Sequence, residues 1–308
     1  MSGFFDNYDL KKIENIELLA KQVVEGFIIG LHKSPFHGFS VEFAEHRIYN
    51  QGEATKNIDW KVYARTDKLF VKKFEEETNL RAQIVIDTSS SMYFPKDRKD
   101  NELNKLQFSS LAAASLMNLL KRQRDAYGLS LFDDKLNIHT KVKASTTHYR
   151  LLLSYLETLI KDEVNNKKTS VVDTLHQIAD SIHKRSLVII FSDMFGQTED
   201  NNKLFSALQH LKYNKHEVIL FHVTDHKLEE DFEFENRPHE FIDMESGERI
   251  KLQSNQVREF YTEKVASFKA DLKMKCLQYK IDFIDTDIRK GFAPILETYL
   301  VKRKKMNI

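Results

Sequence analysis

The sequence predicts an α/β protein built on a doubly wound, mostly parallel sheet. Short apolar runs at residues 84–86 and 187–191 are typical of strands buried on both faces. From Gln83 onward such runs alternate with longer segments of helical apolar spacing, which is the pattern of a parallel sheet covered by helices. Both runs end in acidic and hydroxyl residues, as expected at the sheet edge where open α/β folds bind ligands.

Composition and charge narrow the class of protein. The 308 residues include 47 Lys and Arg against 46 Asp and Glu, and this balance argues against a dedicated nucleic-acid binder. Cys276 is the only cysteine, so no internal disulfide can form and a reducing cytosol fits best. No basic, apolar leader follows Met1, and the apolar runs are far shorter than the roughly 20 residues of a membrane span. We therefore expect a cytoplasmic protein with no membrane span.

Residues 1–80 are expected to form an N-terminal segment, and residues 81–308 the main domain. Apolar residues recur at helical spacing over residues 8–31, which predicts a helix with one apolar face. Short extended pieces should follow, and residues 69–74 are expected to form a strand. The segment is therefore expected to combine one long helix with short strands.

Charged residues lie among apolar ones in this segment. These residues are Arg47, Asp59 and Arg65, and Asp59 directly precedes Trp60, the only tryptophan. They can form an ion-pair network that joins the segment to the main domain. Alternatively, Arg47 and Arg65 can present a face that binds carboxylate or phosphate groups. The residues by themselves leave both interpretations open.

The main domain should alternate strands and helices. Expected strands cover residues 84–86, 127–132, 136–142, 187–191, 217–223 and 281–285. Expected helices cover residues 101–124, 148–160, 171–183, 201–213, 256–278 and 291–303. Short extended pieces are expected at residues 232–235 and 240–242, with a turn at 245–248. Asp133-Asp134-Lys135 should be the solvated tight turn of a hairpin, although the two aspartates can also be read as metal ligands.

A cluster of oxygen-bearing side chains follows the strand at residues 84–86. Asp87, Ser89 and Ser91 alternate there and supply one carboxylate and two hydroxyls. Hard oxygens in this number suit Mg²⁺, which takes one or two carboxylates together with neutral oxygens and waters. The alternative is that these residues only turn the chain and cap the next helix.

A similar ending recurs later in the chain. The strand at residues 187–191 ends in Ser192-Asp193, and Thr169 precedes the helix before it. If the two strands are neighbours, Asp193 and Thr169 can join the oxygen atoms near residue 87 around one cation. Ser170 competes with Thr169 for this role. His222 and His226 flank Asp225 and can also be read as a metal cluster, but histidines satisfied at a strand end are the favoured interpretation.

The proposed ligand set resembles the metal-ion-dependent adhesion site of von Willebrand factor A domains. Over nearly the whole chain, the sequence is also similar to the bacterial family catalogued as domain of unknown function 58. The motifs that carry this similarity are Arg47-Ile-Tyr-Asn-Gln-Gly, Ile58-Asp-Trp, Ala64-Arg-Thr, Asp87-Thr-Ser-Ser-Ser-Met, Asp243-Met-Glu-Ser-Gly-Glu and Asp285-Thr-Asp. The resemblance implies a von Willebrand factor A/Rossmann-like fold.

The resemblance marks six residues of the N-terminal segment as structural or interaction residues. They are Arg47, Tyr49, Gly52, Asp59, Trp60 and Arg65. The sequence departs from the family pattern at three nearby or related positions. Glu53 stands where aspartate is usual, Lys56 where arginine is usual, and Lys168 where a glycine commonly precedes the threonine. Lys56 lacks the bidentate fork of arginine.

The resemblance also implies a function. Ser89 and Ser91 would bind Mg²⁺ directly, with Mn²⁺ or Ca²⁺ as alternatives, and Thr169 would bind directly or through water. Asp87 and Asp193 would act partly through water, leaving one position open for a partner's carboxylate. Such a protein would be a non-enzymatic adaptor or chaperone component. It would work with a MoxR-type AAA+ ATPase and with other von Willebrand factor A-like or membrane proteins of the same system.

Two other classes of function are compatible with these residues. A Mg²⁺-dependent phosphohydrolase can use Asp87 as its nucleophile, but Ser89 stands where the second acid is usual. A serine hydrolase is disfavoured because Gly-x-Ser-x-Gly is absent, and the chain has no phosphate-binding Gly-x-x-x-x-Gly-Lys loop for hydrolysing ATP. A scaffold with a vestigial metal site is the third alternative.

Overall fold

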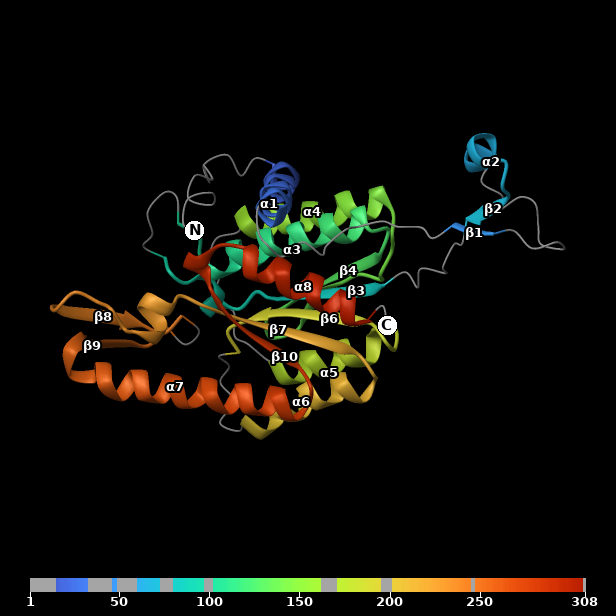
Figure 1. Cartoon of the computed structure of the whole chain (residues 1–308). Helices are drawn as coiled ribbons and strands as arrows, with labels where there is room; N and C mark the ends of the chain where they lie inside the picture. The colour runs from blue at the N-terminus through green and yellow to red at the C-terminus, as the bar shows by residue number, and fades with distance from the viewer. Residues whose placement is uncertain are drawn as a thin grey trace. The chain divides into compact units, whose positions relative to one another are not determined.

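A computed structural model describes most of the chain (Figure 1). The described residues are 15–32, 46–48, 60–72, 80–96, 102–161, 171–194, 201–244 and 247–306. They divide into two compact units. One unit is Ile28–Asn79, and the other combines Met1–Phe27 with Leu80–Ile308. Most of the first helix therefore belongs to the unit that contains the large sheet, whereas the sequence assigned the whole helix to the N-terminal segment.

Three short elements follow the first helix in the described part of the smaller unit. Strand β1 (His46–Ile48) pairs antiparallel with β2 (Phe70–Lys72), with Arg47 opposite Val71. Between them lies helix α2 (Trp60–Thr66), which the sequence did not predict. A helix of 7 residues is shorter than the window in which helical apolar spacing can be recognised. The expected strand at residues 69–74 corresponds to β2.

A six-stranded sheet forms the centre of the larger unit, in the order β10-β7-β6-β3-β4-β5. Its strands are β3 (Arg81–Asp87), β4 (Ala126–Phe132), β5 (Leu136–His139), β6 (Leu187–Ser192), β7 (Glu217–Thr224) and β10 (Asp282–Asp287). All neighbours run parallel except β5, which turns back antiparallel to β4 as the expected hairpin. The predicted fold class, a doubly wound and mostly parallel sheet, is confirmed.

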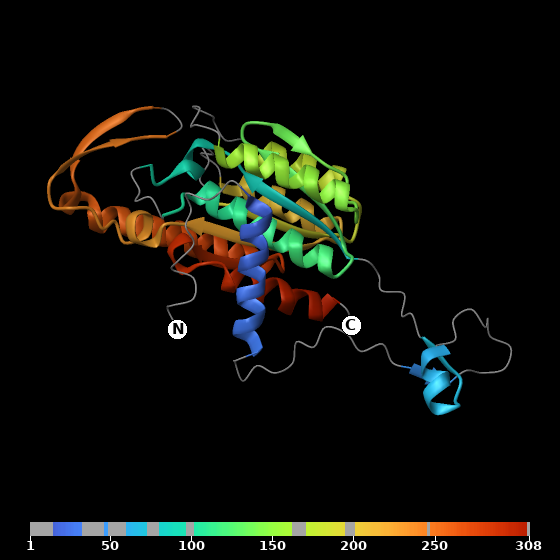
Figure 2. The same cartoon turned by 90° about the horizontal axis from the view of Figure 1, so that it is seen from above.

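Helices cover both faces of this sheet (Figures 1 and 2). One face carries α1 (Ile16–His32), α3 (Lys105–Arg122), α4 (Thr146–Lys161) and α8 (Ala293–Met306). The other face carries α5 (Val171–Ser181), α6 (Asn201–Tyr213) and α7 (Ser254–Gln278). Helix α1 crosses over α3, where Glu25 pairs with Arg122 at 3.4 Å. The predicted helical spacing therefore corresponds to faces that pack on the sheet or on a neighbouring helix.

The central strands are apolar along their length because both of their faces are covered. Every residue of β6 is buried, and in β3 only Arg81 is exposed. The core on the α5 side includes Val85, Leu175, Val188, Ile190, Leu208, Leu220 and Leu272. Burial of this many branched side chains fixes the strands relative to the helices, and with them the loops at the sheet edge.

The start of α3 is set by a capping box. The side chain of Asn104 accepts a 2.8 Å hydrogen bond from the backbone of Gln107, whose side chain accepts one from the backbone of Asn104. The helix therefore begins at Lys105, later than the expected start at residue 101. This places Lys105 in the first helical turn, at the carboxyl edge of the sheet.

Several short elements at that edge were not predicted. A single-turn π helix, η4 (His226–Glu230), follows β7, and two 3₁₀ turns follow β3 and β10 as η3 (Ser90–Tyr93) and η5 (Ile288–Lys290). Strands β8 (Pro238–Ile242) and β9 (Arg249–Gln253) form a hairpin before α7, and β8 contains the extended piece that the sequence predicted at residues 240–242. Within the described ranges, no helix has the length and apolar character to cross a membrane.

Candidate metal site at the carboxyl edge of the sheet

The sheet reverses its strand order between β3 and β6. Strand β3 pairs with β4 on one side and with β6 on the other, in the register Ile86 opposite Phe191. Such a switch point leaves a crevice outside the carboxyl ends of the two strands, where doubly wound folds bind ligands. The pairing meets the condition, set by the sequence, that the strands before Asp87 and Asp193 be neighbours.

Asp87 lies at the end of β3 and is completely buried. Its Oδ2 accepts a 2.6 Å hydrogen bond from the Ser192 hydroxyl, and its Oδ1 accepts one of 3.0 Å from the Ser89 backbone. Burial and the nearby Asp193 carboxylate raise the pKa of Asp87 to about 7, although these hydrogen bonds act in the opposite direction. Asp87 therefore titrates near neutral pH, and a cation bound nearby would favour its ionised form.

The loop after Asp87 brings two hydroxyls together. The Ser89 and Ser91 side-chain oxygens lie 3.1 Å apart, the first buried and the second half-buried. Thr88 anchors the loop to β4, because both its backbone N–H and its hydroxyl donate to the Phe132 carbonyl, at 2.7 and 2.8 Å. The residues predicted from the sequence as ligands on this loop therefore form one local group.

Asp193 follows β6 and is held by a buried lysine that the sequence did not indicate. Lys105 Nζ lies 2.7 Å from Asp193 Oδ2, and both side chains are fully buried. The same ammonium lies 2.5 Å from Glu229 Oε1 of η4. Burial opposes the charge, but Asp193 and Glu229 raise the pKa of Lys105 above its usual value, so it is a cation. In the sequence Lys105 is a single lysine at the start of a helix, and nothing sets it apart.

These side chains fit a Mg²⁺ site only in part. Asp87, Ser89 and Ser91 supply the hard oxygens that Mg²⁺ prefers. The carboxylate of Asp193 is engaged by the ammonium of Lys105, which occupies one of its oxygens. Thr169, like its competitor Ser170, lies outside the described residues.

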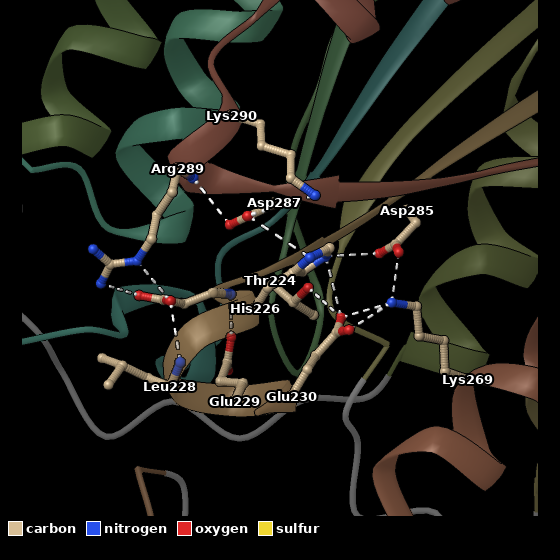
Figure 3. Close-up of polar contacts among 11 residues, drawn as sticks. Thr224, His226, Leu228, Glu229, Glu230, Lys269, Asp285, Asp287, Arg289 and Lys290 are labelled. Atoms are coloured by element: carbon tan, nitrogen blue, oxygen red, sulfur yellow. Dashed lines mark hydrogen bonds and ion pairs between the residues drawn. The ribbon is translucent and has the colours of Figure 1, made fainter. Parts of the chain in front are cut away.

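Figure 3 shows a second network of charges, which Glu229 connects to the candidate site. Arg289 donates two hydrogen bonds to the buried Asp225 carboxylate, at 2.8 and 2.7 Å. The backbone N–H of Asp225 donates in turn to Glu229 Oε2 at 2.7 Å. Glu229 thus links the Arg289–Asp225 pair to Lys105, which connects the loops after β7 and β10 to the candidate site.

His226 and its carboxylate partners complete the network (Figure 3). His226 lies 3.0 Å from Asp285 and 3.3 Å from Glu230. Burial opposes its protonation, but the carboxylates raise the pKa of His226. His226 is therefore satisfied by ion pairs, as the favoured interpretation of the sequence expected.

One further group has the composition of a metal site. His222, Glu230 and Asp285 bring one ligand atom each within 4.8 Å of one another. The ammonium of Lys269 lies between the two carboxylates, 2.7 Å from Glu230 and 2.6 Å from Asp285 (Figure 3). An internal cation already balances these acids, so we read the group as an ion-pair network.

The family-motif residues belong to the smaller unit. Arg47 is in β1, and Trp60 and Arg65 are in α2, where Arg65 is exposed. Tyr49, Gly52 and Asp59 lie outside the described residues. Whether these residues form an ion-pair network or an anion-binding face therefore stays a prediction.

The fold is that of a doubly wound α/β protein, and the carboxylate of Asp87 and the hydroxyls of Ser89 and Ser91 lie at its switch point. The chain belongs to the family described as "Protein of unknown function DUF58", whose model matches residues 45–271. This result confirms the resemblance found in the sequence.

Comparisons with individual proteins give distant matches. An uncharacterized protein of Mycobacterium tuberculosis, Rv1480, is 23% identical over 215 residues, which cover 69% of this chain and 64% of that protein. The structure of the conserved hypothetical protein BatB from Bacteroides thetaiotaomicron has a TM-score of 0.41 and 13% identity, covering 73% of this chain and 99% of that one. An aerotolerance-related membrane protein from Bacteroides fragilis has a TM-score of 0.39 and 14% identity, covering 68% and 92%. Likeness at this level transfers no function.

Proposed function

We propose that this chain is a protein-interaction module, not an enzyme, and that it binds an acidic side chain of a partner through a divalent cation. The observation that carries the proposal is the position of Asp87, Ser89 and Ser91 at the switch point of the sheet, with Asp193 beside them. Mg²⁺ held by these oxygens would keep exchangeable waters, one of which a partner's carboxylate can replace.

Each residue has a defined part in this proposal. Asp87 supplies negative charge, and the hydrogen bonds from Ser192 and Ser89 fix the direction of its two oxygens. The hydroxyls of the buried Ser89 and the half-buried Ser91, 3.1 Å apart, supply neutral oxygens. This arrangement is preorganised, so little conformational entropy is lost when a cation binds.

The position of Asp87 supports binding over phosphoryl transfer. A nucleophilic carboxylate must reach the substrate, but Asp87 is fully buried and both of its oxygens accept hydrogen bonds. Ser89 also occupies the place of a second acid, so no general acid is next to it in the loop. A Mg²⁺-dependent phosphatase activity that Asp87→Asn abolishes would contradict this part of the proposal.

The partner we propose is a MoxR-type AAA+ ATPase, with which the chain would act as a cytoplasmic adaptor or chaperone component. Family resemblance supports this partner, and the site chemistry requires an exposed Asp or Glu on it. A pull-down of a purified ATPase of this type, with Mg²⁺ or with EDTA, tests it directly. Retention that does not depend on Mg²⁺ would contradict metal-mediated docking.

Thermal unfolding with EDTA and with rising Mg²⁺ tests the cation itself. At about 100 times its Kd, a bound ligand adds about 2.7 kcal/mol to the free energy of unfolding. For a unit of this size we expect a rise in Tm on the order of 5–10 °C. Asp87→Ala should remove the shift, whereas Asp271→Ala, on the exposed side of α7, should keep it. An equal shift in wild type and Asp87→Ala would place the cation elsewhere.

A further inference from the structure

We infer that Lys105 is a built-in cation that competes with the divalent cation for Asp193. The candidate site then has two forms, one in which Asp193 is bound to the ammonium and one in which it is released to a metal ion. This inference rests on the site of the proposed function and adds its regulation. It does not depend on which partner docks.

The Lys105 ammonium lies where it would repel a divalent cation bound by Asp193. Lys105 Nζ is 2.7 Å from Asp193 Oδ2. Asp193 directly follows Ser192, whose hydroxyl donates to Asp87 Oδ2 at 2.6 Å, so both aspartates lie at the ends of neighbouring strands. A divalent cation bound beside both aspartates would therefore stand near the ammonium. Two cations at one carboxylate repel each other, and more strongly among buried side chains than in bulk water.

The position of Lys105 is built by the fold. Its backbone N–H donates to the Phe94 carbonyl at 3.0 Å, and the Asn104 capping box fixes the helix start beside it. A cation in the first turn of a helix faces the positive end of the helix dipole, and a lysine is rarely buried completely. Such a placement persists only because Asp193 and Glu229 compensate the charge.

Glu229 offers the ammonium a second partner if it leaves Asp193. Its Oε1 lies 2.5 Å from Lys105 Nζ, while its Oε2 accepts a hydrogen bond from the backbone N–H of Asp225. The Glu229 side chain is thus held in place whether or not Lys105 contacts Asp193. Because Glu229 comes from η4, the loop after β7 helps to decide how readily Asp193 becomes available.

Lys105→Met removes the competing charge and keeps the length of the side chain. In calorimetric titrations with Mg²⁺ we expect its apparent Kd to be lower than that of wild type by at least about tenfold. Its Tm in EDTA should fall, because Asp193 and Glu229 lose their counter-charge, and Mg²⁺ should restore it. The matched control is Lys302→Met. Lys302 also bridges two acids, Glu217 at 2.7 Å and Asp282 at 2.9 Å, but at the opposite edge of the sheet.

A second variant keeps the test decisive if Lys105→Met does not fold. Glu229→Gln removes the second negative charge beside the ammonium, so Lys105 should bind Asp193 more tightly. The apparent Kd of this variant for Mg²⁺ should therefore be higher than that of wild type. Opposite shifts in the two variants, with no change in affinity for Lys302→Met, support the competition. An unchanged Kd in the folded variants overturns it.

These titrations separate the inference from the proposed function. If wild type binds Mg²⁺ through Asp87 and Lys105→Met binds it equally well, the inference fails and the proposed function stands. If only Lys105→Met binds Mg²⁺, the inference holds and wild type does not use Mg²⁺ by itself. If neither folded protein binds Mg²⁺, the competition is refuted.

Discussion

The hydroxyl of Ser192 donates a 2.6 Å hydrogen bond to the carboxylate of Asp87, joining two side chains that are 105 residues apart in the chain. Both residues are fully buried at the carboxyl ends of neighbouring strands. The bond therefore orients the Asp87 carboxylate from the β6 side of the switch point. Ser192 was not among the ligands expected from the sequence, and its role follows from the pairing of β3 with β6.

Ser192→Ala should destabilise the protein through this bond and through the 2.9 Å hydrogen bond that the Ser192 hydroxyl accepts from the Met194 backbone N–H. A hydrogen bond to a buried charged group contributes about 1.5–3 kcal/mol, and we expect a loss of this size in the free energy of unfolding at pH 8 in EDTA. Urea unfolding measures it. Ser115→Ala is the matched control, because the buried Ser115 hydroxyl donates to a neutral helix carbonyl, that of Leu111. Equal losses of unfolding free energy in the two variants would show that the hydrogen bond to Asp87 contributes no more than one to a neutral helix carbonyl.

Asp87→Asn should change how stability depends on pH. The pKa of Asp87 is about 7 in the folded state, above its ordinary value of 3.8, so the folded state binds more protons between these values. In EDTA the Asp87 carboxyl should therefore lower the free energy of unfolding as pH rises from about 4 to 7, by on the order of 4 kcal/mol. Asp87→Asn should lose this component, and Asp271→Asn should retain it. Parallel pH profiles for wild type and Asp87→Asn would contradict the buried, near-neutral carboxyl.

His222→Phe should remove a second pH-dependent component of the free energy of unfolding. This component has the opposite sign to that of Asp87 and covers nearly the same pH range. Burial lowers the pKa of His222 to about 4 from an ordinary 6.5, so the unfolded state binds more protons between these values. His222 therefore contributes stability that is complete above about pH 6.5 and is lost as pH falls to about 4, roughly 3 kcal/mol in all. The phenylalanine keeps the ring that packs 5.5 Å from Phe283. Urea unfolding from pH 4 to 7 should show less acid sensitivity in this variant, and a steeper loss in acid would refute the assignment.

Cys276 should be unreactive in the folded protein. Its side chain is completely buried, and burial raises the pKa of the thiol to about 12, so both access and thiolate are lacking. We expect a thiol reagent at pH 8 to label it only as urea unfolds the protein. Ser267→Cys, on the exposed side of α7, supplies a control thiol that should react at once. Rapid native labelling of wild type would show that α7 opens without global unfolding.

The elements that the sequence predicted well are those with a local pattern of apolar residues. The strands at β3, β6 and β7 are apolar runs because helices cover both faces of the sheet, and this pattern is visible without knowledge of neighbours. The helices α3 to α6 repeat apolar residues at helical spacing for the same reason. Shorter elements such as α2 and η4 carry no periodic signal, and the structure alone revealed them.

The sequence by itself determined the fold class and the group of Asp87, Ser89 and Ser91, since these three residues belong to one loop and their spacing is local. Only the tertiary structure decided that β6 lies beside β3, that Ser192 orients Asp87, and that Lys105 engages Asp193 across 88 residues. Apolar spacing records which face of a strand or helix is buried but not which element it meets. A buried charge finds its partner only when the whole sheet is assembled, because the contact joins residues that no local pattern connects.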